Sequence, residues 1–287
     1  MNVTSSDTSY LSARYQVGYG ADVNDEPAAT KTRDLSGPAW QRRPKRMALA
    51  VVEDLVDRIA GRELEAGDLL PPEGRLCEKY GASRTVLREA VQAVEAMRLV
   101  RSQQGQGTIV RPLEDWDLLN PVVLAAVIRH DAELAILEDL VDMRRTLESQ
   151  MAAQAAARAT DEQLAEISGI YEQLEAAASD PPRHVQLDLE FHEAIMRASG
   201  NRLARAAVLN MLAEGYRSVR YLGDFKEEDC TLSNVDHKEI LDCLLDRNAE
   251  RAEAAMNGHI VRAWLRRRPR RSDEESGSDS RARVSPF

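Results

Sequence analysis

The feature that most constrains the fold is a run of about forty residues, 69–110, where two short helical patterns precede a glycine-rich turn. The first pattern ends at Gly81. Ser83 follows, and its hydroxyl can cap the N-terminus of the second helix. The segment "LVRSQQGQGTIVRP" then reads as a small hairpin around its glycines. An amphipathic stretch at 46–61 precedes the run, so the order predicts a winged helix-turn-helix.

The apolar stripe of the 46–61 helix has helical spacing. It is expected at Leu49, Val52, Leu55, Val56 and Ile59.

Beyond residue 112 the pattern is helical almost throughout, which predicts a second module built only from helices. Breaks rich in Pro, Gly or Asn fall at 180–182, 199–201 and 246–248. The expected helices lie near 116–130, 135–158, 161–178, 181–199, 201–223, 232–246 and 249–266.

We therefore expect a mainly α protein in which a winged helix-turn-helix at 40–112 precedes an all-α bundle of about seven helices at 113–266. Residues 1–39 are polar without a clear period, and residues 267–287 are charged and rich in Ser. Such segments bury little apolar surface, so both are predicted to be disordered tails.

The charge is divided unevenly between these modules. Residues 40–112 carry 13 basic and 10 acidic side chains, for a net charge of +3. Residues 113–261 carry 14 and 29, for a net charge of -15. The first module is therefore the one expected to meet a polyanion such as DNA.

Other function classes find little support in the composition. No run of eighteen apolar residues exists, so no membrane span is expected. The N-terminus lacks the apolar core of a signal peptide. The three cysteines, Cys77, Cys230 and Cys243, are too widely spaced for a disulfide framework, which favours a cytoplasmic location. Cys77 lies in an apolar helical pattern and is expected in the core.

The second helix of the motif carries Arg84 and Arg88 four residues apart, beside Leu87 and Val91. In a recognition helix these arginines would enter the major groove, and arginine is the usual partner of guanine O6 and N7. The opposite face, Val86, Ala90, Val94 and Met97, is expected to pack on the preceding helix. The alternative is an exposed surface on which the arginines pair with Glu89 and Glu95.

The stretch "LLPPEGRLCEKYGASRTVLREAVQAVEAMRLVRSQQGQGTIV" resembles the DNA-binding domain of GntR-type transcription regulators. That resemblance implies DNA contacts from Arg84, Thr85 and Arg88, with Gly105 at the tip of the wing. The hydroxyls of Ser83 and Thr85 can also donate to backbone phosphates. One position departs from the pattern. Many members have an arginine after the glutamate of the Leu-Pro turn, whereas this chain has Gly74 there, followed by Arg75 as a possible substitute.

Histidines are scarce in the second module, and their spacing is suggestive. Asp188 and His192 lie four apart on one helix face, and His237 and His259 belong to two later helices. One carboxylate and three imidazoles from three helices could bind a divalent metal inside the bundle. Spacing alone leaves packed or exposed histidines as the alternative.

The same residues resemble the FCD ligand-binding domain of FadR-like GntR regulators. "DLEFHEAIMRASGN", His237 and a histidine 22 residues later match it, as do "WDLLNPVVLAAVI" and "LEDLVDMRRTLESQMAAQAA". The resemblance implies a metal held by Asp188, His192, His237 and His259, with zinc favoured over nickel, iron or manganese. His130 and His184 match no metal-binding position.

The resemblance also implies a small carboxylate effector over the metal. Arg144 is favoured for its acid group, with Arg220 or Arg217 as further candidates. The chain is thus expected to be a homodimeric transcription regulator, a repressor rather than an activator, that binds a palindromic operator in double-stranded DNA. A sugar acid is the expected type of effector. A metalloenzyme that activates water at the Asp/His₃ site, or a metal with a purely structural role, are the alternatives.

Overall fold

The computed structural model describes residues 45–215 and 226–268. The chain forms two compact units that divide between Val123 and Leu124, and each is described separately below. The elements are α2 (Lys45–Ala60), α3 (Glu73–Tyr80), α4 (Arg84–Ala96), β1 (Val100–Gln103), β2 (Gly107–Val110), η1 (Leu113–Asp115), α5 (Pro121–His130), α6 (Ala135–Arg158), α7 (Asp161–Ala176), α8 (Pro181–Ala198), α9 (Arg202–Gly215), α11 (Glu227–Leu245) and α12 (Ala249–Arg267).

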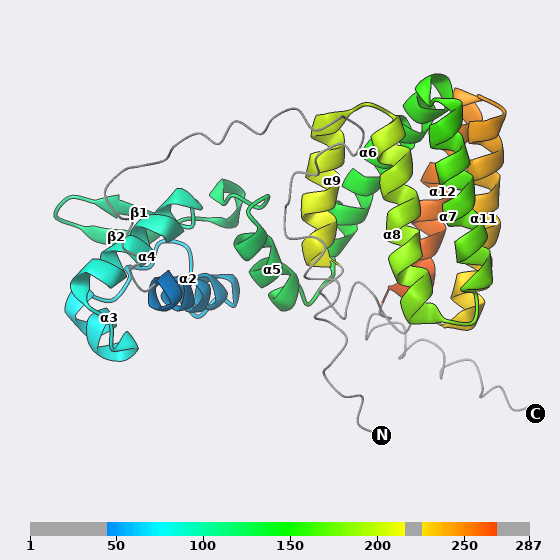
Figure 1. Ribbon diagram of the computed structural model, residues 1–287. Coiled ribbons are helices and arrows are strands. Elements are labelled where there is room, and N and C mark those ends of the chain that lie inside the picture. The colour runs from blue at the N-terminus through cyan, green and yellow to red at the C-terminus, as the bar shows by residue number, and fades with distance from the viewer. Residues whose placement is uncertain (1–44, 216–225, 269–287) are drawn as a thin grey trace, which may run out of the picture. The chain divides into compact units, whose positions relative to one another are not determined.

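The first unit is a winged helix-turn-helix, as predicted (Figure 1). Gly81 ends α3 in the left-handed region at φ 59°, which a glycine adopts without a steric penalty. The Ser83 hydroxyl then accepts a hydrogen bond from the Val86 amide at 3.3 Å, which confirms its role as the cap of α4. The wing is the antiparallel pair β1–β2, with Val100 opposite Val110.

The core of this unit lies between α2 and α4. Val52, Leu55, Val56 and Ile59 of α2 are buried, but Leu49 is half exposed, so its predicted core position was wrong. On α4 the buried residues are Leu87, Ala90 and Val94. The prediction for this face was partly wrong as well. Leu87 takes the place that Val86 was expected to hold, and Val86 and Met97 are half-buried. Cys77 is also half-buried rather than in the core.

The second unit is a bundle of long helices, which confirms the mainly α fold (Figure 1). Helix α6 packs along α12, α12 along α11, and α7 along α8 and α11. The breaks between helices fall at the predicted Pro, Gly and Asn positions. Asp180 caps α8 ahead of two prolines, and Asn248 caps α12 by accepting a hydrogen bond from the Arg251 amide.

Two predicted helix starts were wrong. Helix α5 begins at Pro121 rather than near 116, because Leu113–Asp115 forms a 3-10 turn and the Asn120 side chain accepts a hydrogen bond from Val122. Helix α11 begins at Glu227 rather than near 232, and its first turn holds three acidic side chains, which favour the positive end of a helix. Helix α9 is described to Gly215, and the rest of its predicted span, 216–223, lies outside the described residues.

The tails predicted at 1–39 and 267–287 lie wholly or almost wholly outside the described residues. Within the described ranges, none of the helices combines the length and the apolar character that crossing a bilayer requires.

Candidate metal centre and nucleic-acid interface

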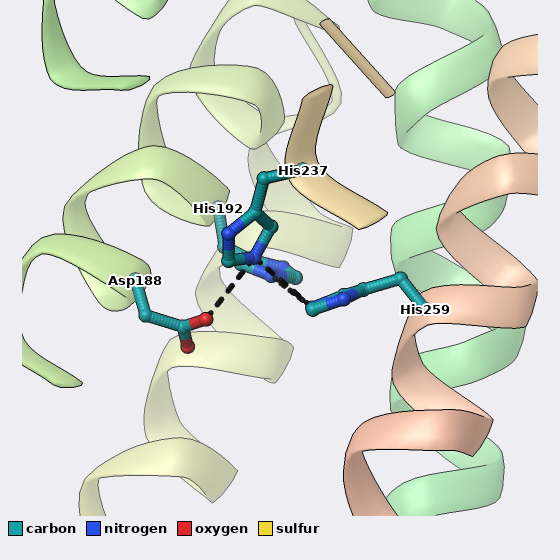
Figure 2. A group of neighbouring side chains, drawn as sticks. All are labelled: Asp188, His192, His237 and His259. Carbon is teal, nitrogen blue, oxygen red and sulfur yellow. Dashed lines mark hydrogen bonds and ion pairs between the residues drawn. The ribbon is translucent and has the colours of Figure 1, made fainter. Parts of the chain in front are cut away.

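Four side chains from three helices of the bundle point toward one another (Figure 2). Helix α8 supplies Asp188 and His192, one turn apart, while α11 supplies His237 and α12 supplies His259. One ligand atom from each lies within 4.8 Å of the others, and all four residues are buried. The structure therefore brings together the four residues that the sequence singled out.

The distances among these atoms suit ligands of one metal ion. His192 Nε2 lies 3.1 Å from His259 Nε2, which lies 3.2 Å from His237 Nε2. His237 Nε2 is in turn 3.1 Å from Asp188 Oδ1. Tetrahedral ligands about 2.05 Å from zinc stand roughly 3.3 Å apart. Three imidazole nitrogens that face one point cannot satisfy one another fully by hydrogen bonding, whereas a cation between them would.

The protonation of His192 is fixed by a buried carboxylate. Its Nδ1 lies 2.6 Å from Oε2 of Glu148, and an ionised carboxylate only accepts, so Nδ1 carries the proton. Nε2 is then the ring nitrogen that faces the centre and is available to bind a metal ion. For His259, Asp236 Oδ2 stands 3.5 Å from Nδ1, which is long for a hydrogen bond. His237 Nδ1 has no hydrogen-bond partner among the described residues.

The electrostatics favour the protonation state that a metal requires. Burial, and then the nearby His237, lower the pKa of His259 to about 3. Burial also lowers the pKa of His237. Burial opposes ionisation of Asp188, but the hydrogen bond with His237 and the neighbouring imidazoles hold its pKa well below the usual range. Near pH 7, His237 and His259 are thus neutral and Asp188 is ionised, as metal ligation needs.

Arg144, predicted to bind the effector's acid group, is only 3% exposed. Its guanidinium donates from Nε to Glu148 Oε1 at 2.6 Å, and the other oxygen of Glu148 meets His192. Burial would raise the pKa of Glu148, but Arg144 and His192 lower it to about 2. Arg217 and Arg220 lie outside the described residues, so their predicted role stays a prediction.

Sequence reasoning missed several polar residues around the centre. Glu148 stands four residues after Arg144 on α6, and Asp236 directly precedes His237, yet neither spacing distinguishes them from surface acids. His184, left out of the metal set, is fully buried and hydrogen-bonds Asn234 Oδ1 at 2.9 Å. Its ring stacks on that of His237 with centroids 6.3 Å apart, but it does not belong to the four-residue group.

The residues predicted to contact DNA are exposed on the first unit, on α3, the start of α4 and the wing. The side chains of Arg84 and Arg88 are 78% and 68% exposed. Both approach one carboxylate, that of Glu73 on α3, at 3.7 and 2.9 Å. Glu73 thus replaces Glu89 and Glu95, the partners weighed from the sequence. Glu95 instead accepts from the amide and hydroxyl of Ser102.

The wing and the first turn of α3 complete this face. Arg75, Thr85 and Gly105 are exposed, and Gly105 has φ 79° at the turn between the strands. Gly107 has φ 100°, and a Cβ there would stand 3.2 Å from Leu69. The wing is thus held against the segment before α3, which also forms a bridge between Leu69 and Ile109.

Both units of the chain are similar to known protein families. The family model described as "Bacterial regulatory proteins, gntR family" matches residues 47–110, and that of the FCD domain matches residues 139–262. This chain belongs to the GntR family and carries an FCD domain. It is a DNA-binding transcription regulator of the FadR-like branch, and its relatives are regulators rather than enzymes, so the metalloenzyme alternative is set aside.

Two relatives agree with this assignment in sequence. The galactonate operon transcriptional repressor of Escherichia coli K12 is 27% identical over 71% of this chain and 90% of its own length. The Glc operon transcriptional activator of the same strain is 28% identical over 77% and 87%. A solved structure described as Streptococcus agalactiae GntR is 26% identical over 76% of this chain and 99% of that one, with a TM-score of 0.42.

Proposed function

We propose that this GntR regulator is a cytoplasmic homodimer that represses transcription and releases its operator when a small organic acid binds over a divalent metal in the FCD domain. The observation that carries the proposal is the convergence of Asp188, His192, His237 and His259 on one buried point. Zinc is the favoured ion, because three imidazoles and one carboxylate suit it, with nickel, iron and manganese as alternatives.

Four protein ligands complete a tetrahedral shell, so the carboxylate oxygens of an effector would bind by expanding the coordination of the ion beyond four. The relative that is named for a galactonate operon supports a sugar acid as the effector class. Arg144 adds positive charge beside the centre. Binding there alters DNA affinity only if the acid has different affinities for the DNA-competent and incompetent states.

On the DNA side, Ser83, Arg84, Thr85 and Arg88 are proposed to contact the major groove, with Arg75 and Gly105 at its flanks. Their exposure on one unit supports this role. Two copies related by a two-fold axis would read a palindromic operator.

The deciding experiment measures the metal content of the purified protein by elemental analysis, beside a His192→Ala/His237→Ala variant. About one metal per chain, lost in the variant, is expected. Release of operator DNA by a panel of sugar acids is then measured with the metal-loaded protein. Metal that raises stability while no acid alters DNA affinity would instead indicate a structural ion. No metal after soaking in zinc, nickel and manganese would overturn the metal-anchored effector and leave the DNA-binding assignment intact.

A further inference from the structure

Behind two of the three clustered histidines stands a carboxylate that is itself paired with arginine. The first such group lies on α6. Glu148 has a fully buried side chain and contacts His192 Nδ1 with one oxygen, at 2.6 Å, and Arg144 Nε with the other, also at 2.6 Å. A buried ion pair of this kind is costly to desolvate, so stability alone is a weak reason for keeping it in the bundle.

The second group joins α11 to α12. Asp236 Oδ1 accepts from Arg262 at 2.7 Å, and Oδ2 lies 3.3 Å from Arg266 and 3.5 Å from His259 Nδ1. Gly258 makes room for this arrangement, because a Cβ there would stand 2.6 Å from an Arg262 nitrogen. The residue before the His259 ligand thus lets Arg262 fold back onto the carboxylate that faces the same histidine.

We propose that Glu148 and Asp236 are positioning residues for the metal ligands His192 and His259, and that their arginine partners keep the centre positive enough to hold an anion. This inference rests on the metal site of the proposed function. It adds how His192 and His259 are oriented and why arginines stand beside the carboxylates that face them.

The orientation follows from hydrogen bonding. A carboxylate on Nδ1 fixes the proton there and leaves the Nε2 lone pair aimed at the ion, and loss of such a partner typically weakens metal binding about 10- to 100-fold. Glu148 is closer to its histidine than Asp236 is, at 2.6 against 3.5 Å. The contribution of Glu148 to metal affinity is therefore the larger of the two.

The charge balance explains why arginines are paired with Glu148 and Asp236. The two carboxylates and the three guanidinium groups carry one net positive charge together. With a divalent ion and Asp188, the region holds two positive charges. Without the arginines it would hold one negative charge and repel a carboxylate ligand. Arg144, at 3% side-chain exposure, is screened far less by solvent than Arg262, at 46%.

The first test measures zinc affinity of the full chain by competition with a chromogenic chelator, and the visible spectrum of the cobalt(II) form. Glu148→Gln is expected to weaken zinc binding about 10- to 100-fold and to alter the cobalt spectrum. Asp236→Asn should weaken it less. Ile167→Val, which trims a buried core residue on α7, is the control for a loosened bundle and should leave both readouts unchanged.

The second test titrates acetate onto the cobalt(II) form as a probe of anion binding. Arg144→Met is expected to keep metal binding and to weaken acetate binding about tenfold. This is the effect of removing one unit positive charge that attracts the anion over roughly 10 Å at an effective dielectric of about 20. Arg144→Met/Glu148→Gln removes both charges and should restore acetate affinity. A double variant that stays weak for acetate would show that Arg144 grips the anion directly and would overturn its role through Glu148.

The outcomes separate this inference from the proposed function. A wild-type chain that binds no metal overturns both. If the wild-type chain binds zinc and Glu148→Gln, folded by circular dichroism, binds it equally well, only the positioning role is overturned. If Glu148→Gln does not fold, the folded double variant provides the same comparison, because it leaves no unpaired buried guanidinium. Unchanged zinc affinity there overturns the positioning role too.

Discussion

Replacement of Arg84 or Arg88 by alanine tests the DNA interface most directly. Their side chains are 78% and 68% exposed, and both pair with Glu73 in solvent, where an ion pair contributes little to folding. Each substitution should therefore change the free energy of unfolding by less than about 0.5 kcal/mol. If the arginine reads a base, operator binding should weaken by about 1–3 kcal/mol, which is roughly 5- to 150-fold in Kd.

The assay is fluorescence anisotropy with an operator selected from a pool of random duplexes, repeated at several salt concentrations. A base-reading arginine should lose affinity mainly for the operator. A phosphate contact should lose it for all sequences and lower the slope of log K against log salt by about one. Arg183→Ala, an exposed arginine on α8 of the other unit, is the matched control and should bind like wild type. Operator affinity within twofold of wild type for both Arg84→Ala and Arg88→Ala would refute the assignment.

Three further predictions concern capping, metal and pH. Ser83→Ala should cost about 1 kcal/mol of stability in urea unfolding, because Val86 loses its cap. Ser83→Asp should keep the cap yet repel phosphate, so weakened DNA binding with unchanged stability is expected. Removal of zinc by a chelator should lower the free energy of unfolding by about 2.7 kcal/mol relative to protein in zinc at 100 times its Kd, and an unchanged melting temperature would contradict this. The pKa of His259 is depressed to about 3 in the folded chain. As pH falls below about 6.5, this histidine therefore takes up a proton in the unfolded chain while it stays neutral in the folded one. Metal-free protein should therefore lose up to about 1.4 kcal/mol per pH unit between pH 6.5 and 5 through this group, and His259→Leu should flatten the slope in urea titrations.

The sequence predicted the features of the fold that depend only on residues close to one another in the chain. Gly81 and Ser83 delimit α4 because a left-handed turn and a cap are properties of a few residues. Asp188 and His192 share a face because they are one turn apart. The third and fourth ligands were predicted by resemblance, since nothing local says that α11 and α12 meet α8.

The errors occurred where long-range packing decides. Leu49 has the spacing of a core residue but lies near the start of α2, and among the described residues it stays half exposed. Glu73 binds both Arg84 and Arg88 only because α3 folds against α4. Glu148 is a partner of His192 because α6 packs beside α8, a long-range contact that the sequence pattern does not predict. Without that contact, an acidic residue in a helical pattern is expected on the solvent-exposed face of the helix.

The division of the four ligands among three helices has a consequence for the order of assembly. Half of the centre, Asp188 and His192, exists as soon as α8 is helical, because both belong to one turn of one helix. His237 and His259 come from α11 and α12, which pack together. An ion captured by the first pair would close a chain loop of about 45 residues when it reaches His237, so it would act on the unfolded ensemble as a reversible cross-link does. The ion of the proposed function would therefore favour assembly of α8 with α11 and α12 as well as effector binding.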